Sequence, residues 1–349
     1  MEKIIDRISV DLILQELTPD KKICDTNKGS NEIYVVNAHN APNTLLVIGR
    51  LREVTFRAAG GSSGLSADLD EFDTMENPYQ QIIIWDPDAK AIIGGYRYIL
   101  GPDVQILENG QPNLATAHMF HFSKKFVKDY LPHLIELGRS FVTPDYQSSK
   151  AGAKAIFALD NLWDGIGAVM MQHSNIFYFF GKMTMYPDYD QSCRDLINHF
   201  LWKHFPDDDV LVRPINQVES VADPRLLDMI LDEEEFKPDY RKLKEAIRKL
   251  GNSIPPLVNT YINSSPTTKM LGTAVNEEFS GVEETGILVC FHEMYADKRD
   301  RHKEPYIKTR VKKLLKRFPK LEKGFEQRLA ERIEHTHEKA FKSFVEKIK

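Results

Sequence analysis

The chain has few of the features that mark disulfide-bonded or metal-binding proteins. Its 349 residues include only three cysteines, Cys24, Cys193 and Cys290. These lie far apart and form no CxxC pair, which predicts reduced thiols packed as small apolar side chains. The eleven histidines form no HExxH motif and no Cys/His cluster. We therefore assign no metal site.

Long apolar runs are also missing. The longest, such as residues 81–85 and 176–180, have the length of strands, whereas a transmembrane helix needs roughly 18 apolar residues or more. The N-terminus carries charge within its first apolar turn and has no signal-peptide core. These absences predict a cytoplasmic protein.

Charge is unevenly distributed along a chain of otherwise ordinary globular composition. Residues 296–349 contain 18 Lys and Arg against 9 Asp and Glu, a charge of +9; because the whole chain carries −5, residues 1–295 carry −14. A basic tail on an acidic body predicts contact with an anionic partner, and a solvated pair of helices is the alternative. Since the excess of basic residues is restricted to the tail, we expect no nucleic-acid partner.

Predicted helices and strands alternate along the chain. We expect helices at about 3–17, 43–59, 123–131, 152–173 and 189–204, and strands at 33–36, 81–86, 91–100, 134–143, 175–181, 269–276 and 286–291. Such alternation predicts a central sheet covered by helices. The charged stretch 207–253 predicts a helical insertion, and the tail from about 305 predicts helices interrupted at Pro319.

Three clusters of charged residues adjoin apolar segments. The first runs from Arg52 and Phe56 to the stretch 68–73, the second is Gly94-Gly95-Tyr96-Arg97, and the third is Glu136-Leu137-Gly138-Arg139-Ser140, followed by residues 142–146. A charge near a core is costly unless it is paired. The clusters therefore predict either structural ion pairs or a functional site.

In this order the motifs resemble those of the ornithine-lipid and glycine-lipid N-acyltransferases, hemolysin-like GNAT proteins related to the acyl-homoserine-lactone synthases. The resemblance extends from about Arg50 to Cys290 and includes the segment 254–261. It implies an α/β (α+β) GNAT fold with a central mixed sheet flanked by helices. The acyltransferase domain would span 1–295, with the helical insertion at 207–253, and a basic helical extension would span 296–349.

The resemblance also implies which residues form the site. Residues that match the active-site cluster of homoserine-lactone synthases are Arg52, Phe56, Asp70, Asp73, Arg97, Glu136 and Arg139. An attacking amine must lose a proton, for which Glu136 is the first candidate base and Asp70 or Asp73 the alternatives. The acceptor's carboxylate would be held by Arg52, Arg97 or Arg139, with Phe56 and Ser140 completing the substrate site. Backbone amides around residues 140–142 would stabilise the oxyanion.

The donor site is predicted on the strand end and loop that follow. Its residues are Phe141, Val142, Ser148, Ser149, Lys150, Gly152 and Lys154. The loop leads into a helix whose N-terminus can hold a phosphate of a pantetheine arm. One glycine stands where acetyl-CoA-using relatives have two, which favours the single phosphodiester of a carrier protein over the pyrophosphate of coenzyme A. The resemblance implies a 3-hydroxyacyl–acyl-carrier-protein donor and no tightly bound cofactor; a coenzyme A thioester is the alternative.

The predicted function is transfer of a (3-hydroxy) fatty acyl group from acyl carrier protein to the α-amine of glycine or ornithine, giving a lyso-aminolipid. Which amino acid is acylated stays open. The alternatives are an acetyl-CoA-dependent acetyltransferase and a hemolysin-like membrane-associated protein without catalysis. Apolar residues interspersed in the basic tail predict either peripheral contact with the inner membrane surface or docking of the acidic carrier protein. The apolar residues of 177–185 predict a slot for the fatty chain or, alternatively, plain core.

Overall fold

The computed structural model describes residues 1–147, 153–317 and 325–348. Within them, one large mixed sheet has the order β1-β2-β3-β4-β6-β7-β10-β9, and β5 pairs with β8 separately. The strands are β1 (Lys22–Asp25), β2 (Glu32–Val36), β3 (Gln80–Asp86), β4 (Ala91–Leu100), β5 (Phe120–Phe122), β6 (Leu134–Val142), β7 (Tyr178–Met185), β8 (Val212–Pro214), β9 (Lys269–Asn276) and β10 (Val282–Cys290).

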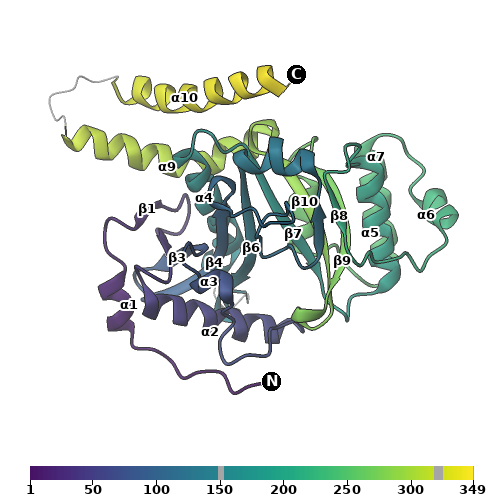
Figure 1. Cartoon of the computed structure of the whole chain (residues 1–349), viewed down its shortest axis with the longest axis horizontal. Coiled ribbons are helices and arrows are strands. Elements are labelled where there is room, and N and C mark those ends of the chain that lie inside the picture. Colours follow the sequence, from purple (N-terminus) through teal and green to yellow (C-terminus); the bar gives the residue numbers. More distant parts are fainter. Residues whose placement is uncertain (148–152, 318–324, 349) are drawn as a thin grey trace.

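Helices cover both faces of this sheet, as Figure 1 shows. They are α1 (Val10–Glu16), α2 (Pro42–Ala58), α3 (Glu71–Thr74), α4 (Ala153–Gln172), α5 (Gln191–His204), α6 (Pro224–Ile230), α7 (Phe236–Lys249), α8 (Pro256–Ile262), α9 (Ala296–Arg317) and α10 (Phe325–Ile348). Single turns of π- or 3-10 helix at Phe126–Tyr130 and Leu131–His133 precede β6.

Strand β3 shows why both faces must be covered. Its side chains alternate: Ile82 and Ile84 join the apolar cluster that contains α4, whereas Ile83 and Trp85 join the cluster that contains α2. Alternating directions along a strand place these two sets on opposite faces. Because both sets are apolar and buried, the strand has no face left for water.

The sheet opens in the middle, between β6 and β7. These neighbours run parallel, but they pair only from Leu134–Glu136 to Tyr178–Phe180. Beyond this point β6 stays paired with β4 and β7 stays paired with β10. The two strands therefore diverge directly after Glu136, and each half of the sheet remains intact.

The basic tail folds back onto the body as two helices that lie side by side at one edge of the molecule (Figure 1). Helix α9 packs along α4, where Arg301 pairs with Asp160 and the His302 Nδ1 lies 2.8 Å from Asp164. Helix α10 places Phe344 against Phe177, at the start of β7. Ile307, Val311 and Phe344 of these two helices are buried against the protein.

The predicted fold is confirmed: a large mixed sheet flanked by helices, with a helical C-terminal segment. The first helix was predicted too long. Residues 1–9 are not helical, because the backbone amides of Glu2 and Ile5 donate to the carbonyls of Gly64 and Ser66 instead. Ser9 then caps α1. The charged stretch 207–253 contains α6 and α7 but also β8, which pairs with β5. Pro319 lies outside the described residues.

Candidate active site

Two cavities meet where β6 and β7 diverge. One, of about 250 Å³, is lined by residues that include Asp70, Arg97, Thr116 and Glu136, and we call it the polar cavity. The other, of about 410 Å³, is lined by residues that include Phe56, Phe141, Tyr186 and Leu257, and we call it the aromatic cavity. Both are bordered by Leu137, Gly138, Arg139, Lys182 and Phe279. The cavities therefore share a junction at the open part of the sheet.

Glu136 lies at the point of divergence and lines the polar cavity. Its side chain is buried, with the hydroxyl of Thr116 donating to Oε1 at 2.6 Å and the hydroxyl of Tyr79 donating to Oε2. Burial raises the pKa of the Glu136 carboxyl, and the two hydroxyl donors oppose that rise only partly. A raised pKa brings a carboxylate closer to the range in which it can accept a proton from an amine.

Arg52 is enclosed in a network of ion pairs and reaches neither cavity. Its guanidinium has no exposed surface; Nε lies 2.8 Å from Asp68 Oδ2 and Nη2 lies 3.0 Å from Asp73 Oδ2. Burial alone would raise the pKa of Asp73, but Arg52 and Arg97 lower it well below its ordinary range. Both partners stay ionised, so the network holds α2 against the loop before α3.

Arg97 and Asp70 extend this network to the wall of the polar cavity. Arg97 Nη1 lies 2.5 Å from Asp70 Oδ1 and 3.1 Å from Asp73 Oδ2. Asp70 also caps α3 by accepting from the amide of Asp73. Both aspartates therefore already bind arginine and backbone groups, which makes each of them a poorer base than Glu136.

Arg139 enters the polar cavity through an irregularity in β6. Its φ is +48°, and the register with β4 shifts between Gly95 and Arg97. Such a bulge re-aims a side chain that would otherwise follow the strand's alternation. The Arg139 guanidinium stacks over Phe279 at 4.6 Å and lies 3.2 Å from Asp68 and 3.6 Å from Asp70.

Lys182 and Glu284 form a second charged group at the junction. Lys182 of β7 lies against Glu284 of β10, which also accepts from Asn276 Nδ2 and from the hydroxyl of Thr184, both at 3.2 Å. Burial alone would raise the pKa of Glu284, but Lys182 lowers it below its ordinary value. The pair therefore stays charged inside the sheet.

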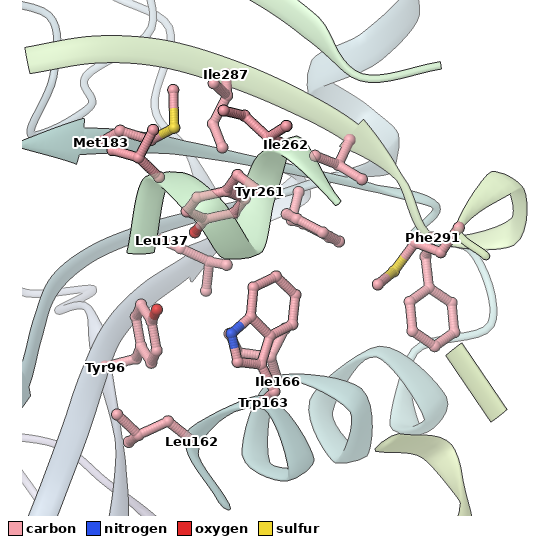
Figure 2. Packing of buried hydrophobic residues seen from close by; sticks show 14 of the residues in the cluster. Tyr96, Leu137, Leu162, Trp163, Ile166, Met183, Tyr261, Ile262, Ile287 and Phe291 are labelled. Carbon is pink, nitrogen blue, oxygen red and sulfur yellow. The ribbon is translucent and has the colours of Figure 1, made fainter. Parts of the chain in front are cut away.

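The aromatic cavity lies between the diverging strands. Ser140, Phe141 and Val142 line it from β6, and Phe56 lines it from α2, 5.2 Å from the ring of Phe279. Figure 2 shows Tyr96 and Tyr261 beside Leu137, with their hydroxyls directed towards each other, in the packed region next to this cavity. Both tyrosines also line it. Apart from Asp188 and the charged side chains at the junction, the wall is mostly apolar with a few hydroxyl groups, which suits the apolar part of an acyl thioester.

The structure brings together most of the residues predicted for the site. Glu136, Asp70, Arg97 and Arg139 line the polar cavity, and Phe56, Ser140, Phe141 and Val142 line the aromatic cavity. Arg52 and Asp73 lie behind the wall and border neither cavity. Lys154 belongs to the first turn of α4. Ser148, Ser149, Lys150 and Gly152 lie outside the described residues.

The slot predicted from residues 177–185 is wrong for most of its members. Phe177 packs on α10, Phe179 on Trp163 and Phe180 on the rings of β5. Tyr178 and Met183 are likewise packed in the core, and only Met185 of this set lines the aromatic cavity. The first part of β7 is paired on both edges and covered on both faces, which buries such side chains as core.

Several residues of the site were missed at the level of sequence. Tyr79 and Thr116 carry no motif, because only the fold brings them to Glu136. Lys182 and Glu284 did leave a signal: each is a charge within an otherwise apolar strand, which is costly without a partner. Pairing a lone basic residue of one apolar strand with a lone acidic residue of another would have identified Lys182 and Glu284.

Among the described residues, no group of three or more His, Cys, Asp or Glu side chains could hold a metal ion. No helix within the described residues is both long and apolar enough to traverse a bilayer. The three cysteines are buried and unpaired, and burial raises the pKa of each thiol, to about 11 for Cys193.

A mixed sheet that splits between two parallel strands, with a buried carboxylate at the split and an apolar cavity beyond it, defines a GNAT-type acyltransferase. Consistent with this, a family model described as acetyltransferase (GNAT) domain matches residues 51–156. No solved structure matches the chain at a significant level.

Two curated relatives give the particular family. Both are named glycine N(alpha)-acyltransferase and are 54% identical to this chain over 88% of its length. The one from Phocaeicola vulgatus is covered over 94% of its own length and the one from Bacteroides thetaiotaomicron over 92%. The chain belongs to this family of N-acyltransferases, which confirms the resemblance found in the motifs.

Proposed function

We propose that this enzyme transfers a long (3-hydroxy) fatty acyl group from the phosphopantetheine of an acyl carrier protein to the α-amine of glycine, giving a lyso-glycine lipid. The observation that carries this proposal is the junction of two unlike cavities at the split of the sheet. The polar cavity has the size and charge for a small amino acid, and the aromatic cavity has the lining for an acyl thioester. The names of the relatives favour glycine over ornithine.

The proposed reaction begins with the acceptor in the polar cavity and the thioester carbonyl at the junction. Glu136 accepts a proton from the glycine ammonium, directly or through a water, which frees the nitrogen lone pair. The nitrogen attacks the carbonyl carbon, and the carbonyl π electrons move to oxygen. Collapse of this tetrahedral intermediate breaks the carbon–sulfur bond, and the sulfur leaves as a thiolate. The nitrogen's second proton passes to that thiolate, directly or through a water, so the products are the amide and the thiol.

Within this scheme the arginines have different roles. Arg52, enclosed by Asp68 and Asp73, holds the wall in place. Arg97 lines the polar cavity but already binds Asp70 and Asp73. Arg139 borders both cavities and stays a candidate for substrate binding. Phe56, Phe141 and Val142 would enclose the pantetheine and the start of the acyl chain.

The carrier protein as donor has support from charge. A groove next to the aromatic cavity shares Leu159 with it and is bordered by Lys298 and Arg301 of α9, and Arg301 pairs there with Asp160. Acyl carrier proteins are acidic, so a basic rim beside the thioester site would steer them. Peripheral contact with an anionic membrane is the second role we propose for the basic tail. Most of the tail's described lysines and arginines are exposed, whereas Phe344 and Val311 are buried against the protein.

The test is a donor-by-acceptor comparison with purified enzyme. Glycine or ornithine is mixed with 3-hydroxypalmitoyl–carrier protein or acetyl-CoA, and products are identified by mass spectrometry. We expect N-(3-hydroxypalmitoyl)glycine to be the main product. If acetyl-CoA is used and the carrier-protein donor is not, the protein is instead an acetyltransferase. This second candidate function is also supported by the GNAT domain.

A further inference from the structure

Lys182 is an internal cation that none of the motifs and no role assigned so far accounts for. It lies on β7, two residues beyond Phe180, which is the register partner of Glu136. Side chains two residues apart on a strand point to the same face. Lys182 and Glu136 therefore face the same side of the open sheet, and both line the polar cavity.

The space between them is kept free by Gly138. Glu136 and Gly138 also share one face of β6, and a Cβ placed on Gly138 would have no atom within 4 Å. Gly138 has no positive φ, so its backbone does not require glycine. The missing side chain leaves room in which a small molecule can touch Glu136 at one end and Lys182 at the other.

The charge of Lys182 is less compensated than that of the neighbouring arginines. Arg139 faces two carboxylates, Asp68 and Asp70, and Arg97 faces Asp70 and Asp73. Lys182 forms an ion pair with one carboxylate, Glu284, among the described residues, and its charge lowers the pKa of Glu136 without an ion pair between the two. An ammonium has three N–H donors, so two remain for a ligand. Glu284 is itself fixed by Asn276 and Thr184, which holds the ammonium in place.

We propose that Lys182 binds the carboxylate of the acceptor amino acid, with the acceptor lying over Gly138 and its amine directed to Glu136. This proposal rests on the proposed function, because it assumes a free amino acid as acceptor. It explains why the enzyme keeps a buried ion pair beside the junction. It also makes a free carboxylate, and not only an amine, a requirement of the acceptor.

The test compares glycine with glycinamide, which has the amine but no carboxylate. The wild-type enzyme should prefer glycine. In Lys182→Met, kcat/KM for glycine should fall at least about 30-fold, mainly through KM, because a buried charge partner is lost. The value for glycinamide should change less than about threefold, so the preference disappears. Lys182→Arg should keep most of the wild-type preference for glycine over glycinamide.

Two further variants separate the loss of carboxylate binding from other effects of removing a lysine. Lys182→Met leaves Glu284 buried without its cation, so the double variant Lys182→Met/Glu284→Gln is measured as well and should lose the same preference. Lys249→Met, which removes an exposed lysine at the end of α7, is the matched control and should behave as wild type.

The outcomes separate the two proposals. If the wild-type enzyme acylates neither glycine nor glycinamide with any donor, the proposed function fails. If the wild type acylates glycine but Lys182→Met slows both acceptors equally, or slows neither, Lys182 does not bind the carboxylate.

Discussion

At the scale of single residues, Glu136 shows how position gives a carboxylate its chemistry. It sits at the last paired position before β6 and β7 diverge, buried and held by two hydroxyl donors. Asp70 and Asp73, the other predicted bases, bind arginines instead. The difference lies in their neighbours, because the three groups are chemically alike.

Glu136→Gln is expected to lower kcat by about 10²–10⁴-fold, since an amide cannot accept the amine's proton. The fold should survive, because glutamine has the same shape and still accepts a hydroxyl hydrogen bond. In the wild type, kcat/KM should fall as pH decreases through the raised pKa of Glu136, because only the ionised form is a base. Steady-state rates across pH check this, with the exposed Glu245→Gln as control. Wild-type rates at every pH would remove Glu136 from the mechanism.

Gly138→Val is expected to fold normally and to fill the space over β6. Valine suits a strand, and a Cβ at this position has no protein atom within 4 Å. Crowding of about 1–3 kcal/mol predicts a rise of roughly 10- to 100-fold in the KM for the acceptor. Gly138→Ala should give a smaller rise in the same assay. An unchanged KM in both variants would place the acceptor elsewhere.

Arg52→Met is expected to lower the free energy of unfolding by about 3–5 kcal/mol, because it leaves Asp68 and Asp73 buried without one of their cations. The two carboxylates have lowered pKa values in the folded state. Their contribution to the free energy of unfolding is therefore present above about pH 4 and is lost as the pH falls further. Urea unfolding at pH 7 measures the loss. Arg225→Met, at an exposed position, should cost almost nothing. A similar small cost for Arg52 would contradict a structural role.

At the scale of elements, α10 is attached through histidines that must stay neutral. His337 Nε2 donates to the carbonyl of Met170 at 2.7 Å, and its Nδ1 lies 3.3 Å from His292 Nε2. The ring of His292 stacks on Phe341. Burial lowers the pKa of His292 to about 3, helped by the neighbouring His337, Arg299 and Lys303. Burial also lowers the pKa of His337.

These shifts predict that acid weakens the attachment of α10. The unfolded state takes up protons near pH 6.5, whereas folded His292 does so only near pH 3, so stability falls between these values as pH decreases. From pH 7 to 5 the loss from His292 is up to roughly 2 kcal/mol. Hydrogen exchange in α10 checks this. His292→Phe keeps the ring stack and should show a shallower pH dependence; an identical slope would exclude His292 as the cause.

At the scale of the whole molecule, the basic tail covers two regions with different neighbours. The start of α9 borders the groove beside the aromatic cavity, whereas the end of α10 packs at the start of β7. If a carrier protein docks at the first region, the two ends of the tail should respond differently to a change of charge.

Lys298→Glu is expected to lower kcat/KM for a carrier-protein donor about three- to tenfold at low salt, because a charge at the rim affects association. The effect should shrink at high salt. An acyl-pantetheine donor, which lacks the protein, should react as with wild type. Lys342→Glu on α10 is the matched control and should leave both donors unaffected. Equal effects of the two variants would indicate that the tail has no specific docking site for the carrier protein. Liposome flotation would then test the other proposed role of the tail, contact with an anionic membrane.

Much of the architecture could be predicted because it depends on local patterns. Alternating apolar strands and capped helices follow from neighbouring residues, and ordered motifs such as Arg52–Phe56 and Glu136–Arg139 identified the family. The roles of individual residues could not be predicted in this way. Arg52 and Arg139 look alike in sequence, yet one is enclosed by aspartates and the other reaches a cavity through a bulge.

What the sequence determined by itself was the class of fold and the family, since both depend on periodicity and on motifs along the chain. Only the tertiary structure decided which charges meet. Lys182 and Glu284 are paired because β7 and β10 are neighbours in the sheet, and Glu136 acquires Tyr79 and Thr116 from segments far away in the sequence. Burial and contact between distant segments set the charge state of a side chain, and neither is a property of its local sequence.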